Sequence, residues 1–357
     1  MELTAGLGSV DDYIRYIEAG ADECFCGYIP YAWDRKYGTV LSLNRREVRC
    51  CSVQLGAFSE LEILAAMVRA YQKPVQLTFN SLYYLPQQYP EIAETIQKCM
   101  EIGFEDYIIA DPALILYLRQ QKIGCRISLS GEVGEINSAM TGLFEQMEIS
   151  RIIFPRKMRP KDMAVVAQAC AKRSPGLENM KYEAFALNEL CQFSGAFCNS
   201  LHCDEMGYLC RVPYRVGVGK SQRKDSILID HKEWDGTASS REYTSEARQC
   251  GGTWDSPESD FDAPILGESG CGLCALYDLG QAGITHLKIV GRGNHPDRMV
   301  EDIRAMKRAL EILDASKDRE TYQKRMKQEL FLSGCSKNCY YLPCLLYTSP
   351  SPRDPKT

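Results

Sequence analysis

The stretch DYIIADPALILYLRQQKIGCRISLS, Asp106–Ser130, contains the alternation that decides the fold. An apolar run ends at Ala110, the pair Asp111-Pro112 opens an apolar helical segment, and a second apolar run follows. Asp is favoured just before a helix, and Pro is tolerated in its first turn. The stretch predicts strand, helix, strand, and the uniformly apolar runs favour parallel strands buried on both faces.

The same alternation extends along the chain in both directions. Eight such strands, separated by helices, predict a TIM-like (β/α)8 barrel, with a doubly wound open sheet as the alternative. The expected strands are Met1–Ala5, Glu23–Gly27, Val75–Asn80, Asp106–Ala110, Cys125–Ser130, Arg151–Phe154, Lys181–Ala186 and Thr285–Val290.

Composition shifts suggest how the chain is divided. Residues 1–216 are expected to hold barrel strands one to seven with a cysteine-rich segment, and 265–316 to close the barrel with strand eight. The polar, aperiodic stretch 217–264 predicts an insertion between strands seven and eight. Residues 317–343 are expected to be a truncated C-terminal extension. The run CLLYTSPSPRD corresponds to one reading frame of a sequencing adapter, so 344–357 are expected to be a scar.

Composition also limits the class of protein. The chain has 357 residues, 45% hydrophobic and 25% charged, as expected of a globular protein. The net charge of -5 gives no overall basic field, so any RNA partner must meet a local patch. No apolar run of membrane-spanning length and no signal peptide is evident, so a membrane partner is not expected. Seventeen cysteines without a secretory signal predict metal binding or buried thiols in the cytoplasm.

The segment Tyr182–Tyr214 places four cysteines directly after an apolar strand. Grouped thiols on irregular backbone suit a soft metal centre, either a 4Fe-4S cluster or zinc. The uneven spacing favours the cluster, because structural zinc usually has paired CxxC motifs; ordinary buried cysteines are the alternative. The candidate ligands are Cys191, Cys198 and Cys210 with Cys274 at long range, and Cys203 and Cys271 are spare thiols that could replace one of them.

A second pair of thiols, Cys335-x3-Cys339, lies near the end of the chain. The pair is expected either to begin a second metal site or to be two incidental thiols. The loop 28–49, rich in Tyr, Arg and Asn, is predicted to line a site because it is too polar and broken for the core.

Active sites of (β/α)8 barrels lie at the C-terminal ends of the strands. Two arginines there are expected to face an anionic substrate, with an ordinary salt bridge as the alternative for each. Asp111 is either a helix cap or a catalytic group. The catalytic candidates are Asp111, Arg156, Lys288 and Arg292, and the substrate-binding candidates are Asn80, Ser130, Arg156 and Arg292. Motifs of zincins, nucleophile-elbow hydrolases and P-loop proteins do not occur.

At these residues the sequence resembles the collagenase-like peptidase family U32 over nearly its whole length. ELTAGLGSVDDYIRYIEAGADECFCG resembles that family's ELLAPAGS and GADAVYLG motifs, and ELCQFSGAFCNS resembles its ALC..YSG.C..S. GLCAL and LKIVGR resemble DLC.L and LKIEGR. The chain departs from the family pattern at Leu187-Asn188, where the family has His-Gly, at Lys157 and at Val290, where it has Glu.

The resemblance implies a TIM-like barrel with a 4Fe-4S cluster on Cys191, Cys198, Cys210 and Cys274. Several members of this family act in oxygen-independent hydroxylation of tRNA, rRNA or ubiquinone precursors, and prephenate is the oxygen donor considered for some. The first hypothesis is therefore an iron–sulfur hydroxylase or RNA-modifying enzyme, with an anionic small molecule such as prephenate, or RNA, as partner. A collagenase-like peptidase is the alternative, and a cluster-bearing subunit paired with another family member is a third.

Overall fold

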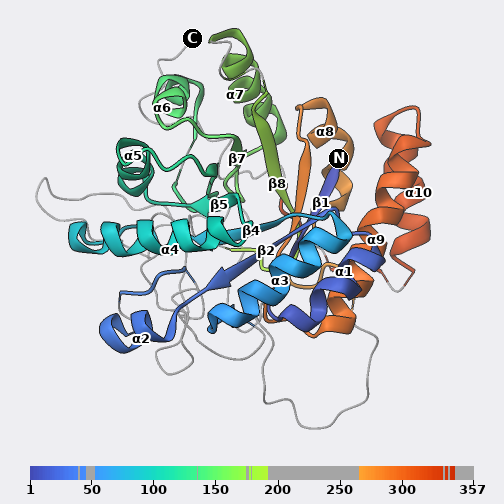
Figure 1. Cartoon of the computed structure of the whole chain (residues 1–357). Coiled ribbons are helices and arrows are strands. Elements are labelled where there is room, and N and C mark those ends of the chain that lie inside the picture. The colour runs from blue at the N-terminus through green and yellow to red at the C-terminus, as the bar shows by residue number, and fades with distance from the viewer. Residues whose placement is uncertain are drawn as a thin grey trace, which may run out of the picture.

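The computed structural model describes residues 1–38, 41–45, 53–134, 136–173, 177, 179–191, 265–332, 334–336 and 338–341. Eight parallel strands follow one another in the order β1-β9-β8-β7-β6-β5-β4-β2, and pairing of β1 with β2 closes the ring. The helices lie outside the strands (Figure 1). The (β/α)8 prediction is confirmed, and the open-sheet alternative was wrong because both edges of the sheet pair with each other.

The strands agree with the sequence-based prediction to within one residue at each end. They are β1 (Glu2–Gly6), β2 (Glu23–Tyr28), β4 (Val75–Phe79), β5 (Asp106–Ile109), β6 (Arg126–Leu129), β7 (Arg151–Ile153), β8 (Lys181–Leu187) and β9 (His286–Ile289). A further two-residue strand, β3 (Gln54–Leu55), pairs with the end of β2 at Gly27 and Tyr28.

The helices alternate with these strands, as the sequence predicts. They are α1 (Tyr13–Ala19), α2 (Tyr31–Tyr37), α3 (Phe58–Tyr71), α4 (Tyr89–Glu101), α5 (Pro112–Gln120), α6 (Thr141–Gln146), α7 (Pro160–Arg173), α8 (Leu276–Gln281), α9 (Pro296–Asp314) and α10 (Arg319–Leu330). None of the helices in the described ranges is both long and apolar enough to cross a membrane.

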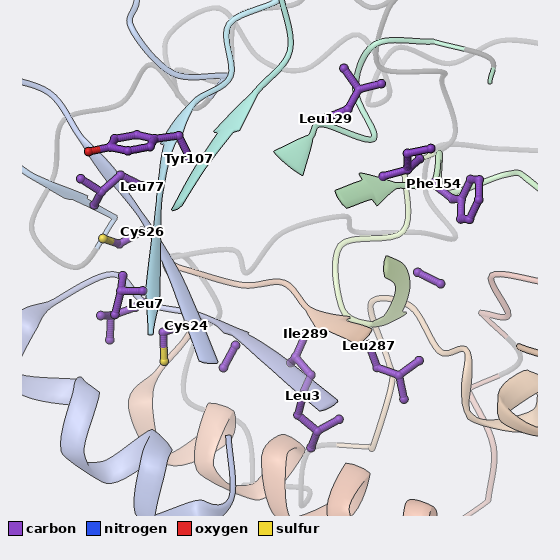
Figure 2. Close-up of a cluster of buried hydrophobic side chains, with 14 of the residues drawn as sticks. Leu3, Leu7, Cys24, Cys26, Leu77, Tyr107, Leu129, Phe154, Leu287 and Ile289 are labelled. Carbon is purple, nitrogen blue, oxygen red and sulfur yellow. The ribbon is translucent and has the colours of Figure 1, made fainter. Parts of the chain in front are cut away.

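The main hydrophobic core lies between the strands and the helices. Leu3, Cys24, Leu77 and Tyr107 are fully buried and project from neighbouring strands (Figure 2). Each buried leucine of this kind stabilises the fold by about 1.5–3 kcal/mol. Because alternate strand residues point outward to the helices, the intervening residues fill the barrel itself.

The inner residues at the N-terminal half of the barrel form a charged network. Arg151 of β7 pairs with Glu23 of β2 on the far side of the ring, and it donates to Glu183 at 2.8 Å. Lys288 donates to the other oxygen of Glu183 at 2.7 Å. All four side chains are nearly or fully buried, so each charge depends on its partners inside the barrel.

The loop 28–49 and the extension that starts at 317 both contain a helix that the sequence did not predict. The loop 28–49 was predicted to be too polar for the core, but it contains α2, whose Trp33 is only 2% exposed. Its indole donates to the Leu41 carbonyl at 3.1 Å, which satisfies the polar atom of an otherwise apolar side chain. The extension that starts at 317 forms α10, which packs against α9. The predicted insertion 217–264 and the predicted scar 344–357 lie outside the described residues.

Candidate active site at the barrel mouth

The C-terminal ends of the strands surround an apolar layer that closes the top of the barrel interior. Four of its members lie on β2, β5, β7 and β8, one directly after β9, and one in the C-terminal segment: Phe25, Ile108, Ile153, Phe185, Val290 and Tyr340. All are buried. Val290 stands where the LKIEGR motif of the family that the chain resembles has Glu. A carboxylate in this buried apolar layer would lose its hydration at a cost in free energy.

Arg292 lies at one side of this layer, directly after β9. Its Nη1 donates to Gln54 Oε1 at 3.3 Å and to Thr78 Oγ1 at 3.4 Å, and its guanidinium lies 5.9 Å from the Phe25 ring centroid. Gly27 makes room for it, since a Cβ there would lie 2.5 Å from Nη1. The predicted position of Arg292 at the barrel mouth is therefore where the structure places it.

Arg156 lies at the other side, after β7. It pairs with Glu132, and its guanidinium stacks 4.1 Å from the Phe185 ring centroid. Burial alone would lower the pKa of Arg156, but the charge of Glu132, with smaller contributions from Tyr340 and Cys191, raises it instead. Arg156 thus stays a cation within electrostatic range of Cys191.

Cys191 follows β8 through a turn with two left-handed residues, Asn188 at φ 67° and Glu189 at φ 50°. Asn188 is buried, and its Nδ2 donates to Asp302 Oδ2 at 2.7 Å and to the Val290 carbonyl at 3.2 Å. Cys191 follows this turn, is half-buried, and lies within electrostatic range of Arg156. The first cysteine of the cysteine-rich segment is therefore positioned by a turn that is fixed on both its backbone and its side chain.

Two tyrosines of the C-terminal segment also reach the mouth, and sequence reasoning missed them. The Tyr340 hydroxyl donates to the Asn188 carbonyl, and its ring stacks on Phe185 at 6.3 Å. The Tyr341 hydroxyl donates to the Phe185 carbonyl at 2.7 Å. The only sequence signal for them is the aromatic pair directly after Cys339, which does not by itself predict where the segment returns.

The remaining predicted substrate and catalytic residues have structural contacts. The carboxylate of Asp111 accepts from Ala113 N at 2.9 Å as the cap of α5, and from Tyr84 N and Tyr89 Oη. Lys288 lies below the mouth, 3.7 Å from the Phe25 ring centroid, and burial lowers its pKa despite the opposing effect of Glu183. Asn80 accepts from Arg45 N at 3.0 Å, and Ser130 accepts from Glu132 N at 3.3 Å.

The structure describes two of the four predicted cluster ligands. Cys191 lies at the mouth, and Cys274 lies in the 3-10 turn Leu273–Ala275 that precedes α8. Cys198 and Cys210 lie outside the described residues, as does the spare thiol Cys203. Within the described part of the chain, no three His, Cys, Asp or Glu side chains are arranged to hold a metal ion. The thiol chemistry of Cys191 beside the Arg156 cation suits a thiolate ligand.

Several solved structures are distantly similar to the chain. A U32 peptidase, Mk0906, is 11% identical with a TM-score of 0.40, covering 55% of this chain and 73% of its own. A native KDPGal structure is 11% identical with a TM-score of 0.40, covering 88% and 97%. Dihydrodipicolinate synthase from Bacillus clausii is 9% identical with a TM-score of 0.41, covering 92% and 79%. These scores are low, so the barrel assignment rests on the strand pairing of this chain.

No curated protein matches the chain. A family model described as peptidase family U32 matches residues 8–341, which include every described strand except β1. The match spans nearly the whole chain, as did the motif resemblance. The chain therefore belongs to peptidase family U32.

Proposed function

We propose that this chain is an iron–sulfur-dependent enzyme of oxygen-independent hydroxylation. The observation that carries the proposal is the position of Cys191, which enters the barrel mouth beside Arg156 and Tyr340. Active sites of this fold lie at that end of the barrel. The cysteine-rich segment that continues from Cys191 would thus hold a cluster next to the reaction site.

A bound 4Fe-4S cluster would supply electron transfer. Cys191, Cys198 and Cys210 would hold it from one segment, and the family resemblance implies Cys274 as the fourth ligand. The Arg156 cation would favour the anionic cluster, because opposite charges attract strongly where water is excluded.

The residues around the mouth support an anionic substrate or donor. Arg156 and Arg292 are guanidinium groups on opposite sides of a layer that contains Phe25 and Phe185. A planar guanidinium binds carboxylate or phosphate by paired hydrogen bonds, and an aromatic layer suits a ring. A nucleotide and a small aromatic acid both have this chemistry.

The proposal is tested by purifying the full chain without oxygen and measuring iron, sulfide and visible absorption. We expect bound iron and sulfide with a broad absorption in the visible blue region. Cys191→Ala, Cys198→Ala and Cys210→Ala should each lose it, whereas Cys170→Ala, a buried thiol in α7, should keep it. A colourless, iron-free wild-type protein would refute the cluster.

The substrate is tested separately. Nucleosides of tRNA and rRNA from a strain that lacks this protein should lack one hydroxylated nucleoside, restored by the wild-type gene but not by Arg156→Ala. If the RNA is unchanged, hydroxylated quinone precursors are measured in the same strain. A strain in which neither changes would argue against hydroxylation.

Peptidase activity is the second candidate, because the family is described as a peptidase family. Of the two described histidines, His286 lies at the N-terminal start of β9 and bonds to Thr285, at the end of the barrel opposite the mouth. His295 caps α9 and is exposed. Gelatin cleavage that persists in the Cys191→Ala and Cys198→Ala variants would favour the peptidase over the hydroxylase.

A further inference from the structure

Three segments far apart in the sequence form a small sheet beside the barrel mouth. Leu187, at the end of β8, forms an antiparallel bridge with Cys271, and Cys271 forms a parallel bridge with Cys339. Cys271 N donates to the Asn338 carbonyl at 2.8 Å, and Tyr340 N donates to the Cys271 carbonyl at 2.9 Å. The backbone of the C-terminal segment is therefore held in register with the loop that precedes α8.

The ring of Tyr340 is fixed as firmly as its backbone. Gly270 makes room for it, since a Cβ there would lie 3.2 Å from Tyr340 Cε2 and 3.0 Å from Leu190 Cβ. The ring stacks on that of Phe185, with the centroids 6.3 Å apart and an angle of 24° between the planes. Tyr340 is only 7% exposed. Its side chain is thus in place before a ligand binds, which reduces the entropy lost on binding.

The Tyr340 hydroxyl contacts both sides of the mouth. It donates to the Asn188 carbonyl, in the turn that leads to Cys191. The Arg156 guanidinium lies on its other side: burial raises the pKa of Tyr340, and Arg156 opposes that rise through its charge and a side-chain hydrogen bond. A hydroxyl that donates to a carbonyl still has lone pairs with which to accept. One hydroxyl therefore joins the cysteine turn to the cation.

Arg156 has a buried donor that lacks an acceptor among the described residues. Its Nη1 pairs with Glu132, and its guanidinium stacks 4.1 Å from the Phe185 ring centroid. Its Nε is buried and finds no hydrogen-bond partner in the described ranges. Leaving a buried donor without an acceptor is costly, and an anionic oxygen at Nε would remove that cost.

We infer that Tyr340 is a positioning residue for an anion bound at Arg156. Its hydroxyl holds the guanidinium beside the Phe185 ring. Because the same hydroxyl donates to Asn188, an anion at Arg156 is coupled to the turn that leads to Cys191. The inference rests on the proposed function, in which Arg156 binds the anionic substrate or donor.

The test measures by calorimetry how phenyl phosphate, an anion with a ring, binds to the full chain. Arg156→Ala should abolish binding. Tyr340→Phe, which keeps the ring, should raise the Kd about tenfold, as expected when one hydrogen bond to a charged group is lost. The matched control is Tyr322→Phe, because the buried Tyr322 hydroxyl also donates to a backbone carbonyl, that of Leu273 at 2.7 Å, but from α10. This control should bind phenyl phosphate as the wild type does.

Two results of the titration would overturn the inference. One is a wild type that does not bind phenyl phosphate. The other is a Tyr340→Phe variant that binds it as tightly as the wild type, because the hydroxyl would then have no part in positioning the guanidinium.

A second measurement uses the wild type and does not depend on the folding of a variant. Hydrogen exchange is followed by mass spectrometry with and without phenyl phosphate. Binding should slow exchange in peptides that cover 186–191 and 338–341, because Tyr340 joins both segments to Arg156. An exchange rate at 186–191 that phenyl phosphate leaves unchanged would contradict the coupling.

Failure of this inference and failure of the proposed function give different results. A protein that holds no iron, but whose Tyr340→Phe variant binds phenyl phosphate more weakly, would refute the cluster and support the positioning role. An iron-loaded protein whose Tyr340→Phe variant binds phenyl phosphate like the wild type would keep the cluster and refute the positioning role.

Discussion

Asn188 stands where the family motif has glycine, and it keeps a backbone conformation that glycine favours. Its φ of 67° is in the left-handed region. Asn is one of the few other residues that adopts this region readily. Unlike glycine, it also supplies a side chain that donates to the buried carboxylate of Asp302. The departure from the motif is therefore accommodated by the backbone.

Replacing Asn188 by Ala should destabilise the fold by about 2–5 kcal/mol. About 1–2 kcal/mol comes from the left-handed backbone, which Ala adopts less readily than Asn, and about 1–3 kcal/mol from the lost hydrogen bond to buried Asp302. Asn188→Gly, the matched control, should lose only the hydrogen bond and be less destabilised. Urea unfolding measures both, and an Ala variant as stable as wild type would contradict the proposed strain.

At the scale of the element, Asp111 links a strand end to the start of a helix. Its carboxylate accepts from Ala113 N in the first turn of α5, and from Tyr84 N and Tyr89 Oη on the preceding loop. A side-chain acceptor there satisfies a backbone donor that the helix itself leaves without a partner. These contacts account for the residue without a catalytic role.

Asp111→Ala should lower the free energy of unfolding by about 2–4 kcal/mol, because it removes both the cap of α5 and the acceptor for Tyr84 N and Tyr89 Oη. Asp111→Asn should be destabilised by less, since Asn keeps the cap and loses only the acceptor for the two tyrosines. Urea unfolding again gives the values. If Asp111→Asn matched wild type in stability but abolished the hydroxylated product, Asp111 would be catalytic after all.

At the scale of the whole molecule, the charged network joins opposite sides of the barrel. Burial would raise the pKa of Glu183, but Lys288 and Arg151 outweigh it and lower the pKa to about 2 from 4.5. Between about pH 2 and pH 4.5, Glu183 is protonated in the unfolded chain but ionised in the folded chain. The stability from Glu183 is thus fully present above about pH 4.5 and is lost as the pH falls toward 2.

Glu183→Gln should destabilise the protein at pH 7 by about 3–5 kcal/mol, because it leaves buried cations with one fewer carboxylate. It should also flatten the loss of stability between pH 5 and pH 3, where Glu183 contributes up to about 1.4 kcal/mol per pH unit. The exposed control Glu62→Gln should keep the wild-type slope. Equal slopes in wild type and Glu183→Gln would contradict the lowered pKa.

The sequence by itself determined the elements and the barrel. The signals that mark each element are local: apolar runs, Pro at helix starts and Gly at helix ends. Eight strands that alternate with helices can be paired in only a few ways. The ends of those strands located Arg156, Arg292 and Cys191 at one mouth. These predictions needed no knowledge of distant contacts.

Only the tertiary structure decided which side chains share a neighbourhood. Lys288 was predicted at the mouth, yet it lies inside the barrel and donates to Glu183. The sequence does not distinguish an inward-pointing residue near the middle of a strand from one near its C-terminal end. Cys335 and Cys339 were an isolated pair until the chain returned after α10 to meet Cys271. Such contacts form between residues far apart in the chain, so their partners are set by how the closed barrel packs and no local pattern encodes them.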